Sequence, residues 1–81
     1  MQPLNGELMS FYIDEALAVT GVTLADLPFP DGAAAALIIR GDTMIAPKGT
    51  TLIQPGDYVY VFAQEEDRQF VLLMFGRPEE E

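Results

Sequence analysis

Turn-forming glycines divide the middle of the chain into short apolar runs. Gly41, Gly49 and Gly56 are eight and seven residues apart, so the runs between them are too short for ordinary helices. Apolar runs of this length between turn signals are typical of strands. The spacing therefore predicts a meander of short hairpins, in which each glycine serves the backbone of a turn.

Strands are expected wherever apolar residues alternate or fill the space between two turns. The run 58–63 has an aromatic face of Tyr58, Tyr60 and Phe62 opposite a face of small aliphatic residues, so both faces need cover. The run 33–40 begins with four alanines, which favour helix, but its length favours a strand buried on both faces. The full set of expected strands is 7–13, 33–40, 43–46, 51–54 and 58–63.

Two helical segments complete the pattern. A brief helix is expected from Thr23, whose hydroxyl can cap its first turn, and two prolines end it. A longer C-terminal helix is expected after the acidic stretch 64–67, with an apolar face formed by Phe70, Leu73 and Met74. We therefore predict an α+β fold, a small β-α-β-β-β-β domain with antiparallel hairpins and a C-terminal helix.

The small size of the chain limits how much surface it can bury. Its 81 residues make one domain, 1–81, which buries only about 60% of the surface of the unfolded chain. Cysteine is absent, so no disulfide adds stability, and this composition fits a reducing compartment. Because the strand at 58–63 also has two apolar faces, we expect a homodimer.

The charge balance excludes two classes of partner. Thirteen Asp and Glu residues against four Lys and Arg residues give a net charge of −9, which repels phosphate backbones and anionic lipid headgroups. The sequence also lacks an apolar run approaching the ~20 residues that cross a bilayer. We therefore expect a soluble, cytoplasmic segment that neither binds nucleic acid nor inserts into a membrane.

The side chains of the sequence offer little for catalysis. Histidine and cysteine are absent, which removes the commonest general base and the strongest nucleophile, and Ser10 is the one serine. Asp31, Asp42 and Asp57 each stand beside a glycine, where we interpret them as turn-formers rather than as metal ligands. We therefore predict a binding domain without enzymatic activity, without a metal site and without a resident cofactor.

Arg40 is the candidate binding residue of the chain. It is one of four basic residues, and it ends the apolar run 33–40 beside a hairpin tip. Its planar guanidinium can bind a phosphate or a carboxylate through several N–H groups. The alternative is an ordinary ion pair with a nearby carboxylate such as Asp42. The sequence around Arg40 leaves both interpretations open.

Several short motifs follow one another in a fixed order. They are Leu27-Pro28, Gly32-Ala33, Ile38-Ile39-Arg40, Ile45, Pro47, Thr51-Leu52 and Pro55-Gly56-Asp57, followed by an apolar strand. Arg40 stands seven residues before Pro47, and Asp57 stands ten residues after it. From about Glu7 to Phe75, this ordered set resembles the TrkA-C domain, also called RCK-C, the C-terminal half of regulators of potassium conductance.

The end of the chain adds a second resemblance. Its motifs Glu66-Asp67-Arg68, Leu73 and Phe75-Gly76-Arg77-Pro78 are similar to those of NhaP-type bacterial cation/proton antiporters. The resemblance implies a regulatory domain joined to the transmembrane part of an antiporter for K⁺ or Na⁺, on the cytoplasmic face of the cell membrane. Residues 1–81 would then be a piece of a longer chain, and the resemblance implies that this piece dimerises.

Some members of the family bind cyclic di-AMP in the dimer cleft. By motif position, the resemblance assigns ligand contacts to Ile38, Ile39, Arg40, Met44, Ile45 and Pro47. This chain departs from the family at its hairpin tip, where Asp42 would lie near a ligand phosphate, and its charge of −9 disfavours a dianion. We therefore expect a nucleotide or cation effector, with cyclic di-AMP disfavoured. The alternative is a purely structural dimerisation domain that binds no ligand.

Overall fold

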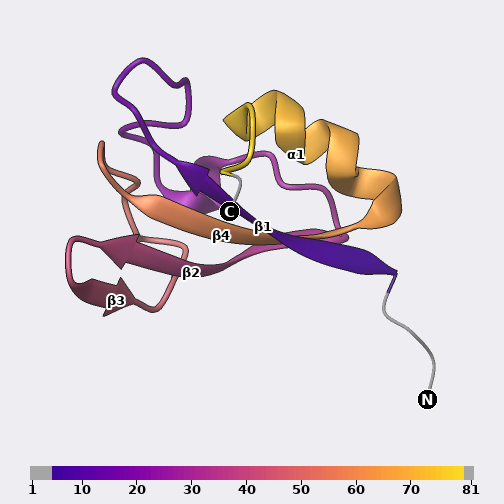
Figure 1. Cartoon of the computed structure of the whole chain (residues 1–81), viewed down its shortest axis with the longest axis horizontal. Helices are drawn as coiled ribbons and strands as arrows, with labels where there is room; N and C mark the ends of the chain where they lie inside the picture. Colours follow the sequence, from indigo (N-terminus) through magenta and orange to yellow (C-terminus); the bar gives the residue numbers. More distant parts are fainter. Residues whose placement is uncertain (1–4, 80–81) are drawn as a thin grey trace.

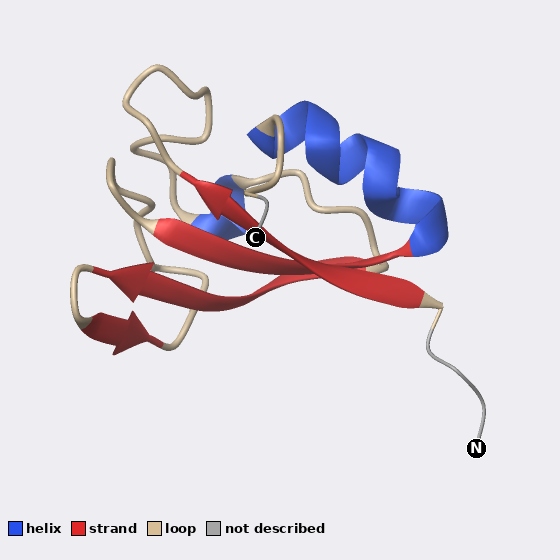
Figure 2. Cartoon of the chain, in the orientation of Figure 1, coloured by secondary structure: helices blue, strands red, loops and turns tan. Residues whose placement is uncertain are grey.

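The computed structural model describes residues 5–79, so residues 1–4 and 80–81, the two ends of the expected domain, lie outside the described part. Four antiparallel strands form one sheet in the order β1-β4-β2-β3 (Figures 1 and 2). They are β1 (Gly6–Tyr12), β2 (Ala33–Arg40), β3 (Thr43–Ile45) and β4 (Tyr58–Gln64). The α+β fold with antiparallel hairpins and a C-terminal helix is therefore confirmed.

One face of the sheet is covered by helix α1 (Arg68–Phe75), which lies above the strands in Figure 1. Two short 3₁₀ helices precede it in the chain: η1 (Leu24–Asp26), between β1 and β2, and η2 (Glu65–Asp67), directly before α1. Phe75 of α1 stacks on Phe11 of β1 with ring centroids 4.9 Å apart. The buried core consists of Met9, Phe11, Ile13, Val19, Ile38, Ile53, Val59, Val61, Ala63, Val71 and Phe75.

The buried face of α1 differs from the one that the sequence predicts. Val71 and Phe75, four residues apart, are buried, whereas Leu73 is 84% exposed and Phe70 is 45% exposed. The prediction was wrong for Phe70 and Leu73, whereas Met74 is half-buried and packs against the core as predicted. Residues 70–75 are all apolar, so several helical stripes have similar hydrophobicity. The turn of η2, which joins β4 directly to α1, fixes how the helix is rotated over the sheet.

The segment 51–54 is extended but is not the fifth strand that the sequence predicts. It pairs with the segment 21–25 rather than with the sheet, and an isolated bridge joins Thr23 to Leu52. The amide of Ile53 donates to the carbonyl of Val22 at 3.0 Å, and the carbonyl of Ile53 accepts from the amide of Gly21 at 2.9 Å. The side chain of Thr23, the residue before η1, does not cap this helix as the sequence predicts.

Two turns adopt the backbone conformation that their sequences predict. Gly41 and Asp42 close the β2–β3 hairpin, and Gly41 takes a φ of 61°, as the first central residue of a type II′ turn does. Gly56 has a φ of 89°, and the amide of Asp57 donates to the carbonyl of Gln54 at 3.2 Å. This is the type II turn predicted for Pro55-Gly56.

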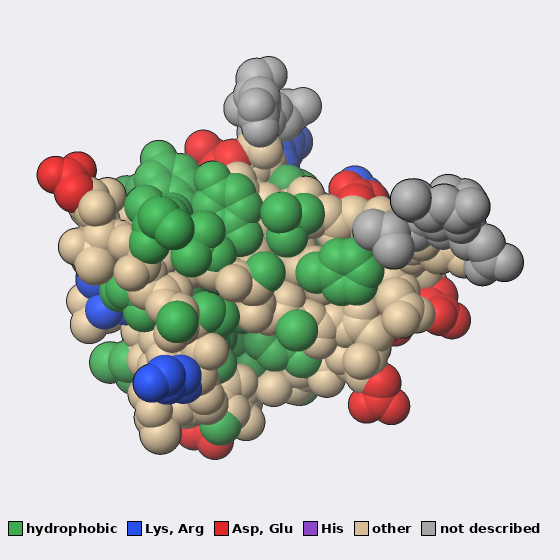
Figure 3. Space-filling model, turned by 90° about the horizontal axis from the view of Figure 1, so that it is seen from below, with side chains coloured by type: hydrophobic (Ala, Val, Ile, Leu, Met, Phe, Trp, Pro, Cys, Tyr) green, Lys and Arg blue, Asp and Glu red, His purple; other side chains and the backbone are tan. Residues whose placement is uncertain are grey.

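The second face of the sheet is open, although the sequence predicts a strand at 33–40 that is buried on both faces. Across it, Leu37 pairs with Tyr60 and Ile39 pairs with Tyr58. Figure 3, which views the molecule from below, shows hydrophobic side chains gathered on this side and acidic side chains at its margins. The open face consists of Leu8, Ser10, Tyr12, Ala34, Leu37, Ile39, Met44, Tyr58, Tyr60 and Phe62. Helix α1 is too short to cover more than one face.

Candidate functional site

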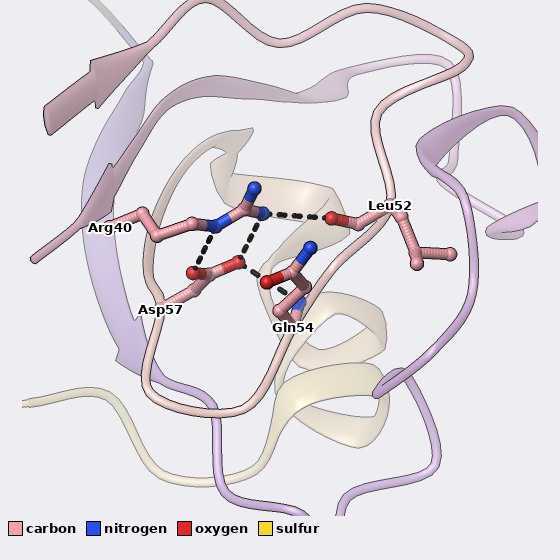
Figure 4. A network of polar contacts seen from close by, with 4 residues as sticks. All are labelled: Arg40, Leu52, Gln54 and Asp57. Carbon is pink, nitrogen blue, oxygen red and sulfur yellow. Dashed lines mark hydrogen bonds and ion pairs between the residues drawn. The ribbon is translucent and has the colours of Figure 1, made fainter.

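Arg40 ends β2 and shares the covered face of the sheet with Ile38, because side chains alternate along a strand. Its guanidinium pairs with the carboxylate of Asp57, seventeen residues further along the chain (Figure 4). Nε donates to Oδ1 and Nη2 donates to Oδ2, both at 2.9 Å. The structure therefore gives Arg40 a carboxylate partner, but that partner is Asp57 rather than the neighbouring Asp42.

The carboxylate of Asp57 is fully buried and is held from several directions. Besides the two bonds from Arg40, its Oδ2 accepts a hydrogen bond from the backbone amide of Gln54 at 2.9 Å. The backbone carbonyl of Asp57 accepts from the amide of Ile13 at 2.8 Å, which fixes the start of β4. Asp57 is thus a buried charge with a fixed partner, and not only a turn-former as the sequence suggests.

Arg40 has a third contact within the chain. Nη2 also donates to the backbone carbonyl of Leu52 at 2.9 Å, so three of the five N–H groups of the guanidinium are bonded. Among residues 5–79, none accepts a hydrogen bond from Nη1. The side chain is 33% exposed, and Figure 4 shows Nη1 directed away from Asp57. The site can therefore donate hydrogen bonds to an external acceptor through Nη1.

The ion pair shifts the pKa of both partners. Burial raises the pKa of Asp57, but the hydrogen bonds from Arg40 and from the Gln54 amide, together with the charge of Arg40, outweigh burial and lower that pKa overall. The hydrogen bond to Asp57 raises the pKa of Arg40 against the opposing effect of burial. Both groups are therefore charged at neutral pH, and neither is available as an acid or a base.

The lowered pKa of Asp57 predicts a pH dependence of stability. A carboxyl with a folded-state pKa below its unfolded value stabilises the fold above the unfolded pKa, and this contribution is lost as the pH falls through the folded value. The difference in free energy of unfolding between the wild type and Asp57→Asn should therefore shrink from about pH 7 to about pH 3. Urea unfolding at several pH values measures it, and a difference independent of pH contradicts the assignment.

The residues assigned to ligand contacts divide between the two faces of the β2–β3 hairpin. Ile38 pairs with Ile45 on the covered face, and Ile39 pairs with Met44 on the open face. Ile38 is fully buried, whereas Met44 is 70% exposed. Arg40 belongs to the covered face, and Pro47 is half-buried in the loop after β3. Within one chain, these six residues do not line a common pocket.

Sequence reasoning missed three groups of the site: the Asp57 carboxylate, the Leu52 carbonyl and the Gln54 amide. The two backbone groups leave no trace in the sequence, because any residue supplies them. One feature of the sequence indicated weakly that Asp57 is buried. It directly precedes the apolar strand β4, where a charged side chain can be buried together with its apolar neighbours. Its partner was not identifiable, since the pairing depends on where the loop 46–57 returns to the sheet.

The matching family model is the TrkA-C domain, over residues 8–75. The K(+)/H(+) antiporter NhaP2 of Shewanella baltica is 30% identical over 74 residues, which cover 91% of this chain and 13% of the antiporter. The Trk system potassium uptake protein TrkA homolog of Archaeoglobus fulgidus is 29% identical over 72 residues, 89% of this chain and 16% of that protein. The chain therefore spans only a small part of the relatives it matches.

A solved structure described as "Structure of RCK domain with cda" has the same fold. It superposes with a TM-score of 0.67 at 22% identity, covering 84% of this chain and 96% of that one. Among the described residues, no helix is long and apolar enough to cross a membrane. The family match over most of the chain, the antiporter relatives and the shared RCK fold agree: this chain belongs to the TrkA-C domain family of regulatory domains.

Proposed function

We propose that this chain is the regulatory domain of a bacterial monovalent cation/proton antiporter for K⁺ or Na⁺, on the cytoplasmic face of the cell membrane. The observation that carries the proposal is the match of 91% of the chain to 13% of a K⁺/H⁺ antiporter. In such a protein the transmembrane part moves the ion, and this domain adjusts its activity. The domain does so as a homodimer that binds a small effector.

The open face of the sheet supports dimerisation. It carries exposed Leu8, Tyr12, Met44 and Tyr58, and the rings of Tyr12 and Tyr58 lie 5.2 Å apart. A contiguous apolar face on a small domain is typical of an interaction surface. A second copy is the occupant that fits best, because acidic side chains lie around the margin of the face and leave its centre free of like charges (Figure 3).

Matched leucine substitutions test the interface. We expect the wild type to sediment as a dimer at high micromolar concentration and Leu8→Glu, on the open face, to sediment as a monomer. The control is Leu73→Glu, which places the same charge on the exposed side of α1 and should leave the dimer intact. A monomeric wild type, or dissociation by the control variant alone, contradicts this interface.

The Nη1 group of Arg40 supports effector binding. Nη1 keeps two N–H groups without an acceptor in the described chain, at the end of a strand that the family resemblance assigns to ligand contacts. The similar solved structure is described as an RCK domain with cda. Because some members of the family bind cyclic di-AMP, that nucleotide is among the effectors to test. The net charge of −9 and the adjacent Asp42 disfavour so strongly anionic a ligand.

Titration calorimetry with a panel of nucleotides and monovalent cations tests the effector. We expect at least one to bind. If it is a nucleotide, Arg40→Lys should weaken that binding by about tenfold or more, because lysine keeps the charge opposite Asp57 but lacks Nη1. Arg68→Lys is the matched control, since Arg68 pairs with Glu7 on β1 and should not affect binding. Binding by none of the panel rejects the effector.

A purely structural dimerisation domain is the second candidate. The observation that favours it is the placement of the six assigned residues on opposite faces of the hairpin, with Ile38 fully buried. Under this alternative, the Leu8→Glu variant loses the dimer while no nucleotide or cation binds to the wild type. The sedimentation and calorimetry experiments together therefore separate the two functions.

A further inference from the structure

The contacts of Arg40 restrict which hydrogen bonds it can offer. A free guanidinium presents two forks, one through Nε and a terminal nitrogen and one through the two terminal nitrogens. Here Asp57 occupies the first fork, with both N···O distances at 2.9 Å. The second N–H of Nη2 is bonded to the Leu52 carbonyl, so the other fork is half used as well (Figure 4). Within residues 5–79, only the donors of Nη1 remain without an acceptor.

The same contacts cancel the charge of Arg40. The carboxylate of Asp57 lies at hydrogen-bond distance from the guanidinium and is fully buried. Cations from solvent therefore cannot replace Arg40 as its partner. The pair is neutral as a unit, and the surrounding chain is strongly acidic. A ligand approaching Nη1 therefore meets a hydrogen-bond donor, but little net attraction for an anion.

We infer that Asp57 and the Leu52 carbonyl position Arg40 to present only the two N–H groups of Nη1, so that Arg40 recognises an uncharged acceptor rather than an anion. The chemical class is a carbonyl oxygen or ring nitrogen, as on a nucleobase, rather than a phosphate or carboxylate, which arginine binds most strongly through two parallel hydrogen bonds and an uncompensated charge. Asp57 is thus a positioning residue that sets ligand specificity without touching the ligand. This inference rests on the proposed effector function and names the ligand group that meets Arg40.

Calorimetry with adenosine, adenosine monophosphate, cyclic di-AMP and inorganic phosphate tests the specificity. For the wild type we expect adenosine and its monophosphate to bind within about threefold of each other, with little dependence on salt, and inorganic phosphate not to bind. Asp57→Asn leaves the charge of Arg40 uncompensated and removes the bonds that position it, so the preference for the monophosphate over adenosine should rise about tenfold at low salt. Asp31→Asn removes an equal charge at the far end of β2 and should leave this preference unchanged.

Side-chain NMR of Arg40 tests the positioning in the free wild type, whether or not Asp57→Asn folds. We expect the Nη2 protons to be resolved and slow to exchange and the Nη1 protons to exchange faster. Averaged Nη signals overturn the inference. So does a wild type that binds the monophosphate more than about tenfold tighter than adenosine, although effector binding itself then stands. Binding by no probe overturns the effector function as well, which distinguishes the two failures.

Discussion

Replacing Phe75 by alanine should lower the free energy of unfolding by about 3–5 kcal/mol. Phe75 is 2% exposed, stacks on Phe11 at 4.9 Å and lies 6.0 Å from the ring of Phe29. Its removal leaves a cavity between α1 and the sheet that neighbouring side chains fill only in part. A domain of this size has a total stability of about 4–12 kcal/mol, so the variant should be largely unfolded or close to it. Urea unfolding followed by circular dichroism measures the loss.

Phe70→Ala is the matched control on the same helix. Phe70 is 45% exposed, and alanine is the better helix former, so this variant should lose about 1 kcal/mol or less. The pair of variants also tests the orientation of α1, because the sequence alone places Phe70 on the buried face. Equal losses for the two substitutions would contradict the observed rotation of the helix.

Removing the side chain of Arg40 should destabilise the domain by about 2–4 kcal/mol, the second largest effect that we expect. The loss comes chiefly from Asp57, which is fully buried and would keep its charge without a cationic partner. The partial exposure of Arg40 lets water reach part of the site, so the expected loss of stability is smaller than for a fully buried pair. Because of this effect, Arg40→Ala by itself cannot report on effector binding.

A double-mutant cycle measures the coupling energy between Arg40 and Asp57 apart from their other contacts. Arg40→Ala together with Asp57→Ala should cost less than the sum of the two single variants, because the double variant no longer buries an unpaired charge. The exposed pair of Arg68 and Glu7, with an N···O distance of 2.8 Å, is the internal comparison and should show a coupling of about 0–1 kcal/mol. Similar couplings in the two cycles would show that burial does not strengthen the Arg40–Asp57 interaction.

The hairpins and turns could be predicted because their causes are local. A glycine with positive φ at position 41 or 56 determines the path of four consecutive residues, whatever the rest of the chain does. Alternation along β4 likewise separates Val59, Val61 and Ala63, which are buried, from the aromatic residues on the opposite face. These features allowed the α+β fold with its hairpins to be predicted without knowledge of any tertiary contact.

The rotation of α1, the partner of Arg40 and the open sheet face could not be predicted in the same way. The run 70–75 is apolar throughout, so the sequence does not determine which of its side chains face the sheet. Thr51–Gln54 has strand-like composition, but its hydrogen bonds go to residues 21–25, and that choice depends on two loops meeting in space.

The sequence by itself determined the short strands, the turns between them and the position of Arg40 at a strand end. Only the tertiary structure decided what Arg40 does there. The sheet order β1-β4-β2-β3 inserts β4 between β1 and β2, and so brings Asp57, directly before β4, beside the end of β2. Local chemistry determines backbone conformation, whereas the partner of a charged side chain depends on which distant segment packs next to it.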